Sequence, residues 1–140
     1  CSHTHFAIFP ELGAPPQWTR EELQELNARN IEWNGKKYTA YEISQMQRAR
    51  ERNVRRWKKR YLAEDAAGLD TTDSAVRLRA ARQSLKDFTQ ATGGRVDSAR
   101  VSVPKFGRSE AGRASAQVRK ASAIQTTQDD KYTPHPHPKK

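Results

Sequence analysis

Two long stretches of the chain carry apolar residues at helical spacing, and only a few residues separate them. The period predicts two amphipathic helices, because residues three and four apart share one face of a helix. In the first stretch, residues 41–61, the apolar stripe consists of Ile43, Met46, Val54, Trp57 and Tyr61. Thr39, with Glu42 three residues later, is typical of a capping box, so we expect this helix to begin there and to end near Ala67.

The second helix is expected shortly after Gly68, a residue suited to the C′ position that ends a helix, with Leu69 placed for the apolar contact that often follows. The segment Asp70-Thr71-Thr72-Asp73 offers a threonine cap and an acidic first turn. A regular seam then follows at spacings of 3, 4 and 3: Leu78, Ala81, Leu85 and Phe88. Two such helices with a short connection predict an antiparallel helical hairpin over residues 39–94.

The apolar stripe of the first helix is interrupted by Arg50 and Asn53. Such a seam is poorly suited to a dry, self-contained pair of helices, because a polar group is costly to bury without a partner. We therefore expect a further chain to cover the middle of the hairpin.

A second capping box precedes the hairpin, formed by Thr19 and Glu22. The helix that it starts is expected to run to about Arg29, with Leu23 and Leu26 as its buried residues. This pattern concerns stability and indicates no chemistry.

Residues 31–38 are typical of a two-stranded β-hairpin. Asn34-Gly35 suits a two-residue type I′ turn, because both positions accept a positive φ. A hairpin of this size is marginal alone, so we expect it to lean on a helix or on a neighbouring chain, with Trp33 as its anchor.

The C-terminal part is sparse in apolar residues and rich in basic ones. Within residues 95–123, an Ala-rich basic helix is expected at 109–123, with Gly112 as its weak point. Four apolar residues before that helix are expected to thread along another surface: Val96, Val101, Val103 and Phe106. Alternating prolines near the C-terminus block helix and strand pairing, so residues 124–140 are expected to form a flexible polar tail.

These elements predict a mainly α fold, a long antiparallel helical hairpin with a small N-terminal β-hairpin and extended arms. Residues 1–38 supply the N-terminal arm, the short helix and the β-hairpin, and residues 39–94 the helical hairpin. Residues 95–123 supply the basic segment and 124–140 the tail. Only 34% of the residues are hydrophobic and 30% are charged, so the core must be thin.

The net charge of +10 is concentrated in residues 48–60 and 95–120. Such clustering favours a polyanionic partner, with nucleic acid ahead of a membrane, although a solvated face with basic linkers would have the same composition. The candidate phosphate contacts are Arg52, Arg55, Arg56, Lys58, Lys59 and Arg60. No apolar run approaches the length of about 20 residues that spans a bilayer, and no signal-peptide core is present.

Three residues near the N-terminus, Cys1, His3 and His5, are of metal-binding types, but a structural zinc site takes four ligands. An ordinary extended segment explains them as well, and we predict no metal and no cofactor. The single cysteine excludes an internal disulfide. Because the chain begins with Cys1 instead of methionine, we expect it to be a fragment.

No catalytic constellation is supported by the sequence. The histidines lie only near the two ends, and Gly93-Gly94 lacks the flanking residues of a phosphate-binding loop. Paired carboxylates such as Glu21-Glu22 sit at a helix start, where they cap the helix. We therefore predict that the protein is not an enzyme and takes no small-molecule substrate.

Short pieces in chain order resemble the phage minor capsid protein type 2 family, which is related to Mu-type head-morphogenesis proteins. They span about residues 1–110. The pieces are Cys1-Ser2-His3 with Phe9-Pro10, Tyr41-Glu42 with Gln47-Arg48, Arg55-Arg56-Trp57-Lys58, Ala66-Ala67-Gly68-Leu69-Asp70-Thr71-Thr72, Phe88-Thr89 with Thr92-Gly93, and Phe106-Gly107-Arg108-Ser109. Two places depart from the family pattern: Ser2 stands where Arg is usual, and Gly93-Gly94-Arg95-Val96 replaces Gly-Leu-Lys-Arg.

The resemblance implies a structural minor capsid protein in the head of a tailed phage, present in few copies near the portal and active in head assembly or DNA packaging. Expected partners are capsid or portal subunits and the phosphates of the genomic DNA, with no membrane. The expected location is the virion, and the host cytoplasm during assembly.

Two alternatives stay open at this stage. The first is a free, sequence-nonspecific nucleic-acid-binding protein that uses the same basic helix, in which an exposed Trp57 would stack on bases. The second is a zinc-linked assembly module built on Cys1, His3 and His5.

Overall fold

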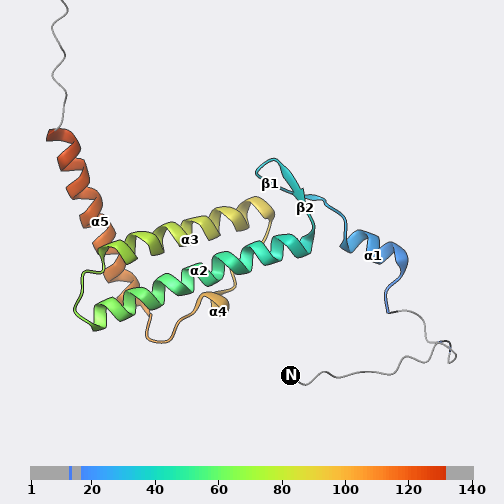
Figure 1. The fold of residues 1–140 in the computed structure, drawn as a ribbon, viewed down its shortest axis with the longest axis horizontal. Helices are drawn as coiled ribbons and strands as arrows, with labels where there is room; N and C mark the ends of the chain where they lie inside the picture. Colours follow the sequence, from blue (N-terminus) through green and yellow to red (C-terminus); the bar gives the residue numbers. More distant parts are fainter. Residues whose placement is uncertain (1–12, 14–16, 132–140) are drawn as a thin grey trace, which may run out of the picture.

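The computed structural model describes residue 13 and residues 17–131. This part of the chain is mainly α with one small antiparallel sheet, as predicted. The elements are α1 (Arg20–Leu26), β1 (Ile31–Trp33), β2 (Lys36–Tyr38), α2 (Ala40–Ala66), α3 (Thr72–Thr92), α4 (Ser98–Val101) and α5 (Arg108–Lys131). Figure 1 shows α2 and α3 side by side, with the β-hairpin at one end of the pair and α5 at the other.

The helical hairpin forms because both of its helices have well-defined ends. At the start of α2, the Thr39 hydroxyl accepts from the Glu42 amide, and the Glu42 carboxylate accepts from the Thr39 amide at 2.9 Å. At its end Gly68 adopts a φ of 70°, and the Leu69 amide donates to the Glu64 carbonyl. Leu69 itself is exposed, so the apolar contact expected there is not made. It lies in the connection beyond the paired surfaces of the two helices, where α2 and α3 have already ended.

The second helix of the hairpin, α3, starts with a different cap from the one predicted. Thr71 lies at the N-cap but makes no side-chain capping hydrogen bond. The Asp70 carboxylate instead accepts from both the amide and the hydroxyl of Thr72. Asp70 therefore caps the first turn of α3, while Thr71 is buried.

The seam between α2 and α3 is the core of the molecule. All four seam residues predicted on α3 are buried, namely Leu78, Ala81, Leu85 and Phe88. On α2, Ile43, Val54 and Tyr61 are buried, while Met46 and Trp57 are half-buried. The antiparallel pairing along one apolar stripe is thus confirmed.

The middle of the seam is covered by this chain itself, which corrects the expectation that a further chain covers it. The segment 95–106, which contains α4, returns along α2 and packs Val101 and Phe106 against the cluster around Val54 and Leu85. Val103 of the same segment is buried. The apolar residues expected to thread along another surface therefore thread along their own hairpin, except Val96, which is exposed.

The N-terminal helix α1 differs from the prediction in length and burial. Its capping box is present, since the Thr19 hydroxyl accepts from the Glu22 amide and the Glu22 carboxylate from the Thr19 amide. It ends at Leu26, three residues before Arg29, and buries none of its residues. Leu23 and Leu26 are exposed because α1 lies apart from the hairpin and meets no core (Figure 1).

The β-hairpin is formed as predicted and leans on α3. Ile31 pairs with Tyr38, and Asn34 and Gly35 both have positive φ, as a type I′ turn requires. The Trp33 ring meets the Phe88 ring edge-on, with the ring centroids 5.0 Å apart. The Arg50 guanidinium, one of the residues that interrupt the α2 stripe, lies 4.1 Å from the centroid of the Phe88 ring, so aromatic rings cover it.

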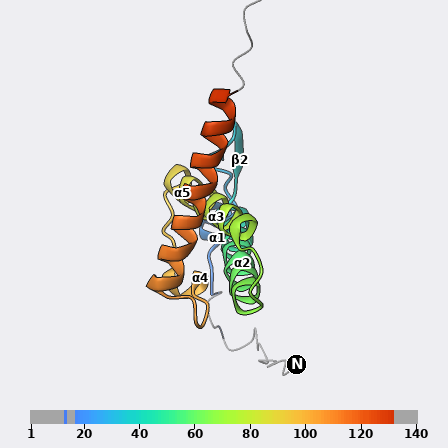
Figure 2. The same ribbon diagram turned by 90° about the vertical axis from the view of Figure 1, so that its left-hand side faces the viewer.

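The last helix, α5, packs its first half across the end of the hairpin, where Ala114 and Val118 join Tyr61 and Ala75 in a second buried cluster (Figure 2). The Glu110 carboxylate accepts from the Ser109 hydroxyl and the Gly107 amide, and these hydrogen bonds lower the pKa of Glu110 to about 2.

α5 continues to Lys131, beyond the predicted end at residue 123. The flexible tail expected over 124–140 therefore cannot begin before residue 132. No glycine or proline occurs between Gly112 and Pro134 to stop the helix.

Replacing Leu85 by alanine is expected to lower the free energy of unfolding by about 2–5 kcal/mol, because the buried side chain leaves a cavity in the seam. Chemical denaturation followed by circular dichroism measures this loss. The matched control is Val76→Ala on the same helix, where the side chain is 41% exposed and little change is expected. Equal losses in the two variants would contradict the seam.

Candidate nucleic-acid interface

A stripe of four basic residues follows α2 next to the seam. Arg48, Arg52, Arg55 and Lys59 are spaced by 4, 3 and 4 residues, which places them on one face of the helix. The adjacent face of the helix packs inward and has a similar spacing. Its buried residues are Glu51, Val54, Lys58 and Tyr61. The basic stripe therefore lies along the edge of the core.

The stripe lines a groove between α2 and the chain that follows α4. The groove has a volume of about 570 Å³, and its walls are Arg52, Arg55, Arg56, Lys59, Ser102, Val103 and Pro104. A smaller hollow of about 260 Å³ continues it, lined by Arg48, Glu51, Arg52, Arg55 and Arg100. Because the two hollows share Arg52 and Arg55, they form one basic surface, which we call the α2 groove.

Four of the six predicted phosphate contacts come together in this groove, namely Arg52, Arg55, Arg56 and Lys59. Arg52, Arg56 and Lys59 are exposed, and Arg55 is half-buried. None of the four forms an ion pair with a carboxylate among the residues that the structure describes. Their charge is therefore available to a ligand.

Lys58 does not belong to this surface, which corrects the prediction. Its side chain is buried, and its ammonium donates to the Val101 carbonyl at 2.5 Å. Desolvation and the nearby Arg82 guanidinium lower the pKa of Lys58. The spacing could have shown this, because Lys58 lies four residues after Val54 and three before Tyr61, within the seam's own period.

Arg60 is exposed but already has a partner. Its Nε lies 2.6 Å from Oε1 of Glu64, one turn later on α2, and this hydrogen bond raises the pKa of Arg60. The pair neutralises the cation locally. Arg60 does not line the groove that Arg52, Arg55 and Lys59 share.

Polar contacts to α2 hold the outer wall of the groove in place. The Glu51 carboxylate is 2% exposed and accepts from the Gln47 side chain at 2.9 Å, with Nη1 of Arg100 at 3.8 Å. The same Gln47 amide donates to the Arg95 carbonyl at 2.8 Å. Together with Lys58, these residues dock segment 95–103 on α2. Sequence reasoning missed Glu51 and Arg100, although Glu51 lies on the seam's spacing.

Trp57 is part of the core border instead of a free stacking surface. It is half-buried and packs on the cluster around Val54 and Leu85. The guanidinium carbons of Arg56 and Arg77 lie 5.4 and 5.3 Å from its ring centroid, respectively. The indole ring thus contacts two guanidinium groups, which leaves little of its surface accessible for stacking on a base.

The predicted metal-capable residues Cys1, His3 and His5 lie outside the described residues. Within residue 13 and residues 17–131, no group of three or more His, Cys, Asp or Glu side chains is arranged to hold a metal ion. No helix in this same part of the chain is both long and apolar enough to cross a membrane.

Comparison with known families bears on the identity of the chain. Residues 1–90 match the family model described as Phage minor capsid protein 2. The chain belongs to this family. It is therefore a phage minor capsid protein, a structural component of the virion. No curated protein and no solved structure matches the chain.

The family match covers α1, the β-hairpin, α2 and nearly all of α3, whereas α4 and α5 follow it. The basic stripe thus lies inside the matched region. The segment that forms the outer wall of the α2 groove lies beyond it.

Adjacent lysines provide a test of the buried contact. Lys58→Ala is expected to lower the free energy of unfolding by about 1–3 kcal/mol, because the Val101 carbonyl loses its buried donor. Lys59→Ala, the matched control, removes an exposed cation and is expected to leave stability unchanged. Chemical denaturation of both variants measures the difference. Equal stabilities would place Lys58 outside the core.

Proposed function

We propose that this minor capsid protein docks onto capsid or portal subunits in the phage head and that its α2 groove binds the phosphates of packaged DNA. Assembly into the head takes place in the host cytoplasm. The observation that carries the DNA contact is the set of four cations in the groove without carboxylate partners among the described residues.

The groove suits phosphate better than it suits a base. Arginine presents a planar fork of donors that matches phosphate oxygens, and the larger hollow of the groove contains three arginines and a lysine. No aromatic side chain lines it. Contacts of this kind fix a protein on the nucleic-acid backbone without reading sequence, and they weaken as salt competes for the phosphates.

Docking onto other subunits is supported by α1. This helix has only seven residues, and helices shorter than about 12 residues are marginal in water even with good caps. Its two leucines and Trp18 are 46–50% exposed. Trp18 and Leu26 also line a hollow of about 470 Å³ with Ile31 and Ala40. A neighbouring subunit that covered this surface would bury apolar area that the chain itself leaves in water.

A free nucleic-acid-binding protein is the second candidate, and the structure offers it less support. That function would use exposed rings among the cations for base stacking. Trp57, the ring that this function would use, packs against the core cluster beside Arg56 and Arg77.

Removing two cations from the α2 groove is expected to weaken DNA binding. For Arg52→Gln/Lys59→Gln, the slope of log affinity against log salt on random double-stranded DNA should become shallower by about 1.8, because each released phosphate contact contributes about 0.9. Fluorescence anisotropy over a salt series measures the slope. Lys36→Gln/Lys37→Gln in β2 makes the same change in net charge and should leave the slope nearly unchanged. A salt-independent affinity of the unmodified chain would overturn the DNA contact.

Removing the apolar face of α1 is expected to reduce incorporation into particles. Leu23→Ala/Leu26→Ala should lower the amount of this chain in purified heads relative to the major capsid protein, measured by quantitative mass spectrometry. The fold should be retained, because α1 buries none of its residues. Glu21→Ala/Gln24→Ala on the same helix is the control and should be incorporated normally. Equal incorporation of both variants would argue against docking through α1.

A further inference from the structure

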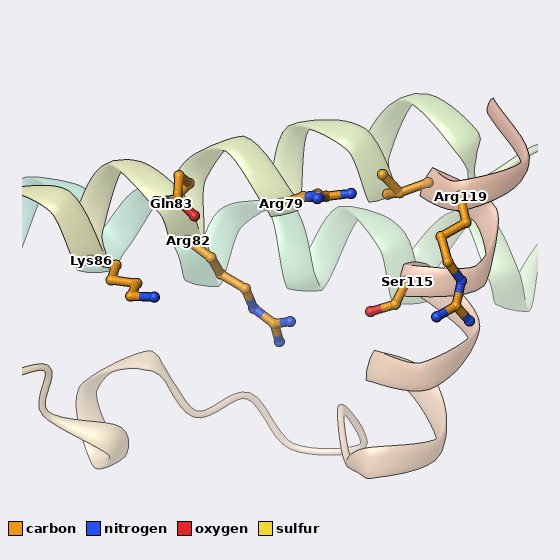
Figure 3. A pocket seen from close by; sticks show the side chains of 7 residues that line it. Arg79, Arg82, Gln83, Lys86, Ser115 and Arg119 are labelled. Carbon is orange, nitrogen blue, oxygen red and sulfur yellow. The ribbon is translucent and has the colours of Figure 1, made fainter. Parts of the chain in front are cut away.

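A second basic cleft lies between α3 and α5. It has a volume of about 400 Å³ and is lined by Arg79, Arg82, Gln83, Lys86, Ser115, Val118 and Arg119. Figure 3 shows these side chains facing one space, with Arg79, Arg82 and Lys86 coming from α3 and Ser115 and Arg119 from α5. No carboxylate lines the cleft.

The four cations of this cleft are not neutralised within the described chain. Seven ion pairs are formed there, and their basic members are Arg29, Arg60, Arg77, Arg100 and Arg113. None involves Arg79, Arg82, Lys86 or Arg119. Like charges that are gathered without counterions repel one another, so the folded chain keeps this cluster at some cost.

Arg82 connects the cleft to the core. Its guanidinium carbon lies 5.6 Å from the centroid of the Phe106 ring, and the Lys58 ammonium lies 5.4 Å from the same centroid. Partial burial lowers the pKa of Arg82 below its ordinary value. A cation that is partly desolvated and positioned by a ring loses less freedom when it binds an anion than a fully solvated one does.

The spacing of the cations favours an extended polyanion. Arg79, Arg82 and Lys86 lie on one face of α3, and the row is about 10 Å long at a rise of about 1.5 Å per residue. Successive phosphates of one nucleic-acid strand advance by about 3.4 Å along the helix axis, so the row is as long as about three such steps. Arg119 faces the same space from α5, and a single small anion would leave most of these cations unused.

The residues that line the cleft also favour a nucleic acid over an acidic protein as the partner. Protein interfaces are anchored by aromatic or aliphatic side chains in their centre, and Val118, which is buried, is the one apolar residue of this lining. Binding to a phosphate backbone needs no such anchor. At the edge of the row, the Asp87 carboxylate already accepts a hydrogen bond from the Gln83 side chain at 2.7 Å.

We propose that the cleft between α3 and α5 is a second, sequence-nonspecific site for the phosphate backbone of a nucleic acid. It lies on different elements from the α2 groove, and it unites α3 with a helix that follows the family match. The inference takes the class of partner, nucleic acid, from the proposed function. Its site is independent of the α2 groove, so an experiment can disprove one site without the other.

Removing two cations of this cleft tests the proposal in the full chain. For Arg79→Gln/Arg119→Gln on random double-stranded DNA, the slope of log affinity against log salt is expected to become shallower by about 1.8. Arg79→Lys/Arg119→Lys keeps both charges and should keep the slope, which separates loss of charge from loss of fold. Lys36→Gln/Lys37→Gln has the same net charge as the first variant and should keep the slope as well.

Three outcomes would overturn the proposal. The first is an equal change of slope in Arg79→Gln/Arg119→Gln and Lys36→Gln/Lys37→Gln, which would mean that only the net charge acts. The second is an unchanged DNA slope with lost binding of polyglutamate, which would assign the cleft to an acidic protein. If Arg52→Gln/Lys59→Gln alters the slope and Arg79→Gln/Arg119→Gln does not, the α2 groove stands and the second site falls; the reverse result overturns the α2 groove alone.

Discussion

The structure depends on how polar residues in the seam of α2 are satisfied. Glu51 and Lys58 occupy seam positions and are buried, and each would be costly there without partners. The returning segment supplies those partners through the Val101 carbonyl and Arg100. Leaving a buried polar group without its partner typically costs about 1–3 kcal/mol, whereas an exposed ion pair contributes about 1 kcal/mol or less. The contacts of the two buried side chains therefore hold the segment on α2.

This arrangement connects the thin core to the basic surface. Because Glu51 and Lys58 face inward, the neighbouring positions Arg52, Arg55 and Lys59 must face the border between α2 and the returning segment. The same segment carries Phe106, whose ring meets the Tyr61 ring on the core side and approaches Arg82 on the side of the second cleft. One stretch of chain thus closes the hairpin and forms a wall or support of both basic hollows.

Local patterns predicted the elements well, because capping boxes, turn residues and seam spacing act within a few residues. Thr39 with Glu42, Asn34-Gly35 and the seam from Leu78 to Phe88 all have their predicted structure. Two failures are local, namely the cap of α3, which Asp70 makes, and the end of α5. The others concern contacts that are distant in sequence. The helix α1 has the cap and the leucines of a buried helix, but it buries none of its residues. Its own sequence does not indicate that the helical hairpin lies too far away to cover it.

The basic surfaces could be predicted only in part for the same reason. Four of the six predicted phosphate contacts share one groove because they lie within three turns of one helix, whereas Lys58 is buried because it lies within the period of the seam. The second cleft combines Arg79 and Arg82 with Arg119, which is separated from them by two connections and α4. No local spacing relates Arg119 to the two arginines of α3.

The position of α5 determines where its basic residues lie relative to those of α3. Arg113 of this helix pairs with Asp65 at the end of α2, and Ala114 and Val118 pack on Tyr61 and Ala75, so one face of α5 is neutral or apolar where it meets the hairpin. Arg119 is left beside the row on α3. If α5 served only to close the end of the hairpin, a carboxylate in this cleft would have stabilised the packing by balancing the α3 cations. A site lined by cations on both helices is instead what binding of a polyanion requires.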